Sequence, residues 1–571
     1  MQELNLGHSD FKDIIQNNNY FVDKSMLIEE VLKAQKSVLL FPRPRRFGKT
    51  LNLSMLRYFF DKSEPENKKL FKDLKIWQTG EDIKQHSCKY PILYLTFKDA
   101  KKETWQGCYE FIVSEIVDLY STHDYLLEGT ILKNHEKAIF QNILIKKASK
   151  TEYETSLKQL SKYLEKYHKE KVVVLIDEYD TPIQASHNKF YNDAISFMRS
   201  LLSGALKDNR SLYKGIITGI LRVSKESIFT GLNNLSVYSI LDEEFSDKFG
   251  FTEQEVKQIT KDFNIKTAYS EIKKWYDGYK FGKTTKIYNP WSILSFVVSK
   301  NERFKTFWTN TSANELIRNE IKKKNSENIR TEIVKLINGE TVVKDIEENF
   351  VFPDLIKRKS LFWTLLTYSG YLTTQKEIRF GEYALLIPNY ELKIIFKKTI
   401  IEWLETDVKV IKSLLQDTAN ALLNNNIAKF EKGFKEIIGD TFSYYDTAKN
   451  HEYVYHSYIL GLLAIIGDEY IIKSNRESGD GRYDIMLIPH DKNKNGVVIE
   501  IKEIEKKLAK ETHEKFATRI NKLIDEALQQ IEEKEYYKEL IDNKISKDKI
   551  VKLPIVFAGK TPYITKIKEQ N

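Results

Sequence analysis

The stretch FPRPRRFGKTL, residues 41–51, decides how the first part of the chain folds. The apolar run SVLLF leads into it and the amphipathic run KTLNLSMLRYFF begins within it, so the sequence predicts a strand, a loop and a helix in succession. Gly-Lys-Thr at the start of such a helix is typical of a phosphate-binding loop, where backbone N–H groups and the helix N-terminus cradle phosphate. The general pattern GxxxxGK[ST] has glycine where this chain has Arg43, so we expect a turn of a different shape.

The end of this loop carries the residues that we expect to bind a nucleotide. Lys49 would contact the β- and γ-phosphates, and Thr50 would ligate magnesium. The prolines at 42 and 44 lack an N–H group, but the donors nearest to the phosphates come from the later residues of the loop. The predicted cofactor-binding residues of this segment are Arg46, Phe47, Gly48, Lys49 and Thr50.

A second motif is of the kind that accompanies a phosphate-binding loop. The apolar run VVVLIDEYD ends in Asp177 and Glu178, an arrangement in which the aspartate holds magnesium through water and the glutamate orients the attacking water. The next apolar run, GIITGILR, offers Thr218 as a polar sensor at the strand end and Arg222 as a charge near the γ-phosphate. The alternative is that these are ordinary buried strands with acidic ends.

The pattern of apolar segments divides the chain into three parts. From about residue 37 to 221, continuous β-branched runs alternate with helical patterns, which indicates a parallel sheet covered on both faces. We therefore expect an α/β nucleotide-binding domain at 1–245, a helical lid or connector at 246–406 and a second α/β domain at 407–571. The connector should contain a helix that begins after an N-cap at Thr252.

Composition limits the classes of protein. A chain of 571 residues is too long for one hydrophobic core, and 41% hydrophobic residues indicate a globular protein. Without a long apolar run or a signal-peptide pattern, we expect a cytoplasmic protein with no membrane association. The two cysteines, Cys88 and Cys108, are too few for a disulfide framework or a Cys-rich zinc site. The net charge of +9 permits nucleic-acid binding but does not require it.

A second candidate site lies in the stretch GRYDIMLIPHDKNKNGVVIEIK, residues 481–502. Two strands joined by a polar turn form a hairpin in which Glu500 and Lys502 face the same side. A register with an even residue sum, for example Ile488 opposite Val498, would place Asp484 opposite Lys502 and next to Glu500. A slip of one residue would separate them.

This cluster has the composition of a metal-dependent nuclease site. Asp484 and Glu500 would hold one or two Mg²⁺ or Mn²⁺ ions, while Lys502 would position or help deprotonate the attacking water. The pattern D-x₁₅-E-x-K has the form of the PD-(D/E)XK signature, with Tyr483 at the position of the proline. The alternative is a surface salt bridge.

Two neighbouring helical segments could complete this site. In ALQQIEEKEYY, Gln530, Lys534 and Tyr537 would lie on one helical face and flank the scissile phosphate. Upstream, HEYVYHSYILGLL would be the first helix of the same core, with Glu452 and His456 one turn apart. The alternative is that these are ordinary residues on a helix face.

Several blocks resemble, in the same order, a known family: the bacterial AAA-ATPase-like proteins with a C-terminal PD-(D/E)XK nuclease domain. The blocks are YFVDKSMLI, RPRRFGKTL, LIDEYDTPI, FTGLNNL, FGFTEQEV, YDGYKF and YNPW. The resemblance covers nearly the whole chain and implies that RPRRFGK[ST] is this family's form of the phosphate-binding loop. It also implies that Glu452 joins the metal site, as an acidic residue of that helix often does in nucleases of this fold.

These observations lead to one functional hypothesis and two rivals. The chain is expected to bind ATP with magnesium, to hydrolyse it, and to cut DNA, with RNA as the alternative substrate. The nucleotide state would control access to the nucleic acid or assembly of the protein, and the protein could form a homo-oligomer. The first rival is a nucleotide-dependent switch whose nuclease fold serves only to bind DNA or a partner. The second rival is a nuclease that cuts RNA or needs no ATP.

Overall fold

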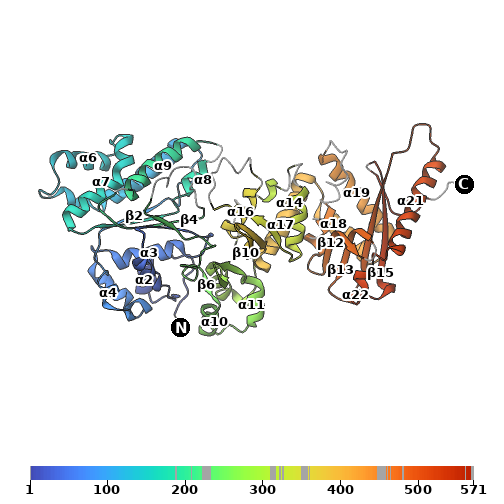
Figure 1. Cartoon of the computed structure of the whole chain (residues 1–571), viewed down its shortest axis with the longest axis horizontal. Helices are drawn as coiled ribbons and strands as arrows, with labels where there is room; N and C mark the ends of the chain where they lie inside the picture. Colours follow the sequence, from blue (N-terminus) through green and yellow to red (C-terminus); the bar gives the residue numbers. More distant parts are fainter. Residues whose placement is uncertain are drawn as a thin grey trace. The chain divides into compact units, whose positions relative to one another are not determined.

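The computed structural model describes residues 2–186, 189–207, 209–221, 233–308, 317–320, 323, 327–348, 358, 360–445, 458–459, 461–462, 464–478, 481–559 and 561–567. The chain forms two compact units (Figure 1). Met1–Trp308 and Val343–Glu391 make up the first unit, and Thr309–Val342 and Leu392–Asn571 the second. Within the described part of the chain, none of the helices combines the length and the apolar character needed to cross a bilayer.

A five-stranded parallel sheet forms the centre of the first unit, in the order β2-β3-β4-β1-β5. The strands are β1 (Val38–Pro42), β2 (Ile92–Thr96), β3 (Val172–Asp177), β4 (Leu212–Gly219) and β5 (Leu235–Val237). Every residue of β1 and β3 is buried, as the continuous apolar runs predict. The sequence did not indicate β5, a strand of three half-buried residues.

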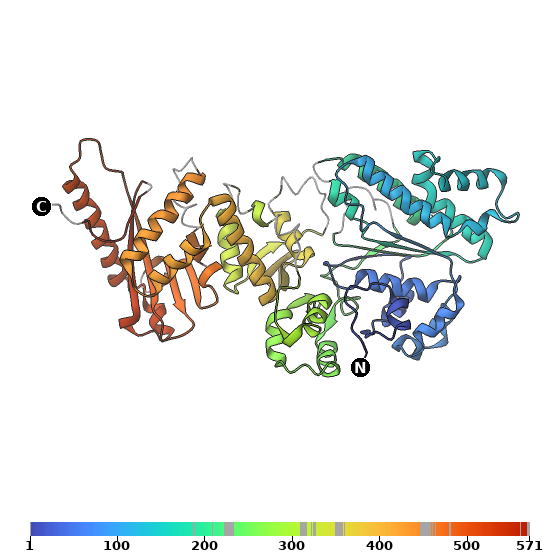
Figure 2. The same ribbon diagram turned by 180° about the vertical axis from the view of Figure 1, so that it is seen from behind.

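Helices cover both faces of this sheet, which confirms the predicted α/β fold (Figures 1 and 2). On one face lie α7 (Lys150–His168) and α9 (Tyr191–Leu206); on the other lie α2 (Met26–Lys33) and α3 (Lys49–Phe60). The helix α3 follows β1 directly after the loop at 43–48, so the predicted succession of strand, loop and helix is correct.

The middle of the chain is helical, as predicted, and also contains two small three-stranded sheets. Its helices include α10 (Glu253–Asp262), α11 (Tyr269–Tyr276), α12 (Pro290–Val297) and α16 (Ser360–Ser369). The sheets are β6-β8-β7 (Phe251–Thr252, Thr284–Tyr288, Tyr279–Phe281) and β10-β11-β9 (Thr373–Arg379, Glu382–Leu386, Val342–Asp345). Thr252 caps α10, since its hydroxyl accepts a hydrogen bond from the N–H of Glu255 at 3.4 Å.

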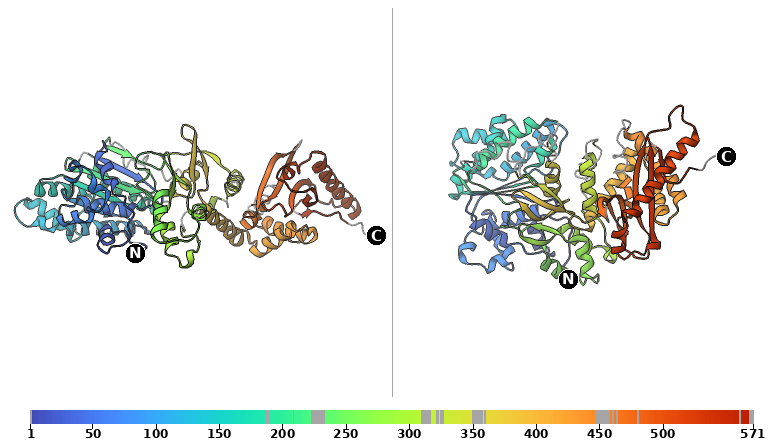
Figure 3. Two further views of the ribbon diagram at one scale, coloured as in Figure 1. Left: turned by 90° about the horizontal axis from the view of Figure 1, so that it is seen from below. Right: turned by 45° about the vertical axis from the view of Figure 1, so that its right-hand side comes forward.

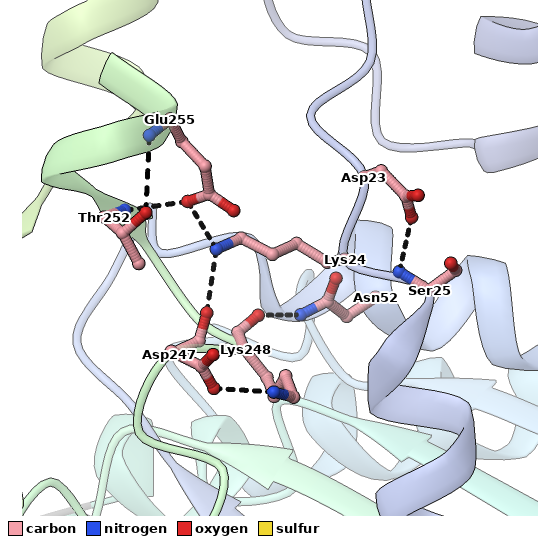
Figure 4. Close-up of polar contacts among 8 residues, drawn as sticks. All are labelled: Asp23, Lys24, Ser25, Asn52, Asp247, Lys248, Thr252 and Glu255. Carbon is pink, nitrogen blue, oxygen red and sulfur yellow. Dashed lines mark hydrogen bonds and ion pairs between the residues drawn. The ribbon is translucent and has the colours of Figure 1, made fainter. Parts of the chain in front are cut away.

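A buried lysine joins the N-terminal segment to the start of α10 (Figure 4). The ammonium of Lys24 lies 2.7 Å from Glu255 Oε2 and donates to the carbonyl of Asp247 at 2.8 Å. Nearby, the Asn52 amide on α3 donates to the carbonyl of Lys248 at 2.9 Å. Burial lowers the pKa of Lys24 although Glu255 acts against the shift, so the pair forms a largely desolvated brace. A cavity of about 1310 Å³ borders this cluster.

The second unit contains a mixed sheet in the order β12-β13-β14-β15-β16. The strands are β12 (Tyr470–Ser478), β13 (Gly481–Pro489), β14 (Gly496–Ile504), β15 (Ile550–Ala558) and β16 (Thr561–Tyr563); only β14 and β15 are paired in parallel. Helix α21 (His513–Glu533) packs against β14 and β15, and α19 (Ile427–Tyr445) against β16 (Figure 3). Further helices among the described residues of this unit are α14 (Glu327–Ile337), α18 (Lys412–Leu423) and α22 (Lys538–Asp542). Helix α17 (Tyr390–Trp403) begins with the last two residues of the first unit and continues in the second.

Two candidate active sites

The loop between β1 and α3 contains two residues in the left-handed region of backbone conformation. Arg46 has φ 66° and Gly48 has φ 82°. A Cβ atom built on Gly48 would meet no atom within 4 Å, so the space above the start of α3 is open. Glycine is favoured at 48 because of its φ, and the open space beside it, at the N-terminus of α3, could admit a phosphate.

Lys49 is buried and binds the carbonyl groups of its own loop. Its Nζ donates to the carbonyl oxygens of Arg43 at 3.0 Å and Pro44 at 2.9 Å. Burial lowers the pKa of Lys49, and the neighbouring carboxylates of Glu178 and Asp177 oppose this shift. The cation is therefore held in place by groups that a phosphate could replace.

Arg43, the departure from the general loop pattern, points into the protein core. Its guanidinium donates to the carbonyls of Tyr238 and Phe245 and lies 5.0 Å from the ring centroid of Phe249. Complete burial lowers the pKa of Arg43 to about 9. This side chain thus anchors the segment after β5, which explains why an arginine can replace the usual glycine.

Three polar side chains meet at the carboxyl ends of neighbouring strands. Asp177, at the end of β3, is completely buried. Its Oδ2 accepts a hydrogen bond from Thr50 Oγ1 at 2.6 Å, and its Oδ1 accepts one from Thr218 Oγ1 on β4. The order β3-β4-β1 brings the three together, because parallel strands end at the same edge of the sheet.

The residues after Asp177 turn sharply. Glu178 has φ 51° and its Oε2 accepts a hydrogen bond from Thr181 Oγ1 at 3.1 Å. Asp180, which the sequence did not single out, is buried and accepts N–H bonds from Ile220 and Leu221. Burial raises the pKa of Asp180. The third carboxylate of the DEYD run, its second aspartate, was the signal that could have identified it.

The remaining predicted residues of this site have different surroundings. Phe47 is buried against Tyr279 and Phe281, with ring centroids 5.0 and 5.3 Å away. Arg46 is exposed, and its guanidinium lies 4.2 Å from the ring centroid of Trp291. Arg222 lies outside the described residues.

In the second unit, the strand register is even but differs from the example predicted. Met486 pairs with Val498, so Ile488 does not lie opposite Val498, and that prediction is wrong. Continued by one residue, the same register brings Asp484 opposite Glu500 instead of Lys502. The Oδ2 atom of Asp484 accepts a hydrogen bond from the N–H of Ile501 at 2.7 Å. The even sum still keeps Asp484, Glu500 and Lys502 on one face.

A hydrogen-bonded cluster surrounds Glu500, whose side chain is almost completely buried. Its Oε1 accepts hydrogen bonds from Lys502 Nζ at 3.0 Å and Gln530 Nε2 at 2.7 Å, and Lys502 also donates to Gln530 Oε1. Its Oε2 is buried with no hydrogen-bond partner among the described residues. Burial, and then the charge of Asp484, raise the pKa of Glu500, while Lys502 and Gln530 act in the opposite direction.

The helical face predicted at 530–537 does not extend that far. Helix α21 ends at Glu533, Lys534 is its exposed C-cap, and Glu535 has φ 46°. The residue that reaches the site is therefore Tyr536, whose hydroxyl accepts a hydrogen bond from Gln530 Nε2 at 2.7 Å. Tyr537 instead faces Lys552, whose Nζ is 4.3 Å from its ring centroid, so the prediction for Tyr537 is wrong.

The described residues contain no group of three or more His, Cys, Asp or Glu side chains that could hold a metal ion. Asp484 and Glu500 form a pair of carboxylates, and the predicted further ligand Glu452, like His456, lies outside the described residues.

Comparison with known proteins gives matches at both ends of the chain. Residues 5–229 match the family model of a predicted AAA-ATPase, and residues 450–567 match that of the PD-(D/E)XK nuclease superfamily. The chain is also 24% identical over 406 residues to an "Uncharacterized protein in vnfD 5'region" of Azotobacter chroococcum mcd 1, an alignment that covers 70% of each chain.

Proposed function

The chain carries an AAA-ATPase-like domain followed by a domain of the PD-(D/E)XK nuclease superfamily, and from this premise we propose that it binds and hydrolyses ATP and cuts phosphodiester bonds in DNA. Residues 1–245 would supply the nucleotide site, 246–406 a lid or connector, and 407–571 the nuclease. The nucleotide state would control access to DNA or assembly of the protein in the cytoplasm.

The residues of the first unit fit a nucleotide with magnesium. The open space beside Gly48 and the N-terminus of α3 suit phosphate oxygens, and Lys49 would exchange its two carbonyl partners for them. Thr50 and Asp177 offer the hard oxygen atoms that Mg²⁺ prefers. Glu178 would orient the attacking water, and Thr218 holds the Asp177 carboxylate in place.

The residues of the second unit fit a divalent cation. Asp484 and Glu500 provide hard carboxylate oxygens, and Glu500 Oε2 is a buried acceptor that lacks a partner among the described residues. A bound Mg²⁺ or Mn²⁺ would activate water and neutralise charge on the scissile phosphate. Lys502, held by Glu500 and Gln530, would orient that water, while Gln530 and the exposed Lys534 would face the nucleic acid.

One observation carries the nuclease proposal. Residues from two different elements, β14 and α21, converge on a single buried carboxylate, with Lys502 and Gln530 bound to the same oxygen of Glu500. Burying a carboxylate that keeps one oxygen without a partner is unfavourable, so such an arrangement is typical of a site that binds a cation.

The experiment that tests the proposal is cleavage of plasmid, linear DNA and RNA by the purified full chain with Mg²⁺ or Mn²⁺, with and without ATP. Glu503→Gln is the matched control for Glu500→Gln, because Glu503 is exposed and lies on the same strand, three residues further along. Cleavage by wild type and Glu503→Gln but not by Glu500→Gln supports the proposal. Equal cleavage by all three would overturn the nuclease assignment.

A second candidate is the nucleotide-dependent switch in which the nuclease fold only binds DNA or a partner. The observation in its favour is that Asp484 and Glu500 are not joined by a third His, Cys, Asp or Glu side chain among the described residues. Salt-sensitive DNA binding by a wild type that cuts no substrate with either metal would favour the switch.

A further inference from the structure

A buried carboxylate lies close to the nucleotide loop and has no role in the chemistry proposed above. Glu391, at the beginning of α17, is 1% exposed. Its Oε1 accepts a hydrogen bond from the N–H of Trp308 at 2.8 Å, and its Oε2 accepts one from Ser292 Oγ at 2.8 Å. Burying a carboxylate is unfavourable, so the contacts that hold Glu391 in this position have to be identified.

The first of its partners leads directly to the loop. Trp308, whose N–H binds Glu391, is buried, and its indole Nε1–H donates to the carbonyl of Arg45 at 3.3 Å. One residue thus binds Glu391 through its backbone and the nucleotide loop through its side chain.

The second partner leads to the loop through α12. Ser292 lies in the first turn of this helix, and Asn289 caps the helix by accepting the N–H of Ser292 at 3.1 Å. The same Asn289 donates its amide to the carbonyl of Arg45 at 3.4 Å. The neighbouring Trp291 carries the guanidinium of Arg46 over its ring.

The charged and titratable groups that face Glu391 come from three elements. Arg46 of the loop favours the charged form of Glu391. Burial first, and then the charge of Glu391, raise the pKa of the hydroxyls of Tyr276 on α11 and Tyr279 on β7. Burial is the largest effect and raises the pKa of Glu391 to about 7, against the N–H and O–H donors that bind it.

We propose that Glu391 is a positioning residue that braces Arg45 and Arg46 of the nucleotide loop, and that it takes up a proton when the nucleotide binds. This inference rests on the proposed nucleotide binding. Phosphate groups beside Arg46 would add negative charge near Glu391 and would compete for the guanidinium that now favours its ionised form. Both effects favour the protonated carboxyl, so the affinity for nucleotide falls as the pH rises.

The test is isothermal titration calorimetry of the full chain with Mg-ATP, in buffers of different ionisation enthalpy, between pH 6.5 and 8. Wild type should take up a fraction of a proton near pH 7 and lose about 3- to 10-fold in affinity towards pH 8. Glu391→Gln should bind with no proton uptake and with little change in affinity over this range. Glu402→Gln, on the exposed side of the same helix, should behave as wild type.

A second variant separates the positioning of the nucleotide loop from the uptake of a proton by Glu391. Trp308→Phe removes the indole N–H that binds Arg45 but keeps the backbone N–H to Glu391, so it should weaken Mg-ATP binding several-fold and retain proton uptake. Proton uptake of equal size in wild type and Glu391→Gln, or none in a wild type that binds ATP, would overturn the inference. Equal affinity of wild type and Lys49→Ala would instead overturn the nucleotide site itself.

Discussion

The two candidate sites differ in how their charged side chains are hydrogen-bonded. In the first unit, Lys49 binds two carbonyls of its own loop, and both oxygens of Asp177 accept hydrogen bonds from threonine hydroxyls. In the second unit, one oxygen of Glu500 accepts two hydrogen bonds while the other has no partner among the described residues. The first site can therefore exchange internal partners for a ligand, whereas the second has an acceptor that a cation would satisfy.

The sites also differ in how the chain assembles them. Neighbouring parallel strands place Asp177 and Thr218 at one edge of a sheet, and the loop after β1 brings Thr50, at the start of α3, to the same edge. The second site needs a hairpin register and a helix that contributes Gln530, 30 residues after Glu500. The first arrangement follows from the strand order, while the second depends on the exact pairing of β13 and β14.

The largest effect is expected at the second site. Asp484→Asn and Glu500→Gln should each lower DNA cleavage by roughly 10⁴-fold, because each removes a ligand of the proposed metal. The double variant should be hardly slower than either single one, since the residues act as a unit. Cleavage rates and an ATPase assay on the same preparations measure this. Loss of ATP hydrolysis in parallel would contradict the separation of the two sites.

At the first site, Glu178→Gln should reduce ATP hydrolysis by about 10³-fold and leave Mg-ATP affinity unchanged, because a residue that orients the attacking water acts in the chemical step. Lys49→Ala should weaken binding by about 10- to 100-fold through the loss of charge-assisted hydrogen bonds. Steady-state kinetics and calorimetry separate the two. A Glu178→Gln variant with normal turnover would remove this residue from the mechanism.

Removing the cation of an ion pair should lower the unfolding free energy more at the buried pair of the first unit than at the exposed pair of the second unit. Lys24→Met leaves Glu255 and the carbonyl of Asp247 without their buried partner, so we expect a loss of about 3 kcal/mol in unfolding free energy. Lys494→Met in the second unit breaks a largely exposed pair with Glu469 and should change stability by about 0.5 kcal/mol or less. Denaturant unfolding measures both, and equal losses would refute the difference.

The smallest effect concerns the stability of the second unit. The pKa of Glu500 is raised in the folded state, so the unfolded chain loses its proton first as the pH rises above about 4.3, and folding is increasingly penalised. Glu500→Gln should therefore be more stable than wild type by about 1 kcal/mol at neutral pH without divalent metal, and equal to it at pH 4. Mg²⁺ should stabilise only the wild type. Thermal unfolding with and without Mg²⁺ tests this, and a destabilised variant at pH 7 would contradict it.

Local spacing alone determined much of this protein. The apolar run before Gly48 and the amphipathic run after it predict β1, the loop and α3, because periodicity is a property of neighbouring residues. The same holds for the strand that ends in Asp177 and for Glu500 and Lys502, which share a face since side chains alternate along a strand. The family matches confirm the AAA-ATPase-like and PD-(D/E)XK resemblance on which the functional hypothesis rests.

Only the tertiary structure decided which distant groups meet. Arg43 turns inward because the carbonyls after β5 and the ring of Phe249 receive its guanidinium, which no local pattern indicates. Tyr536 replaces Tyr537 beside Gln530 because the chain leaves the helix after Glu533. Glu391 is linked to the nucleotide loop through Trp308 and α12, since long-range contacts arise from packing and not from the period of any one segment.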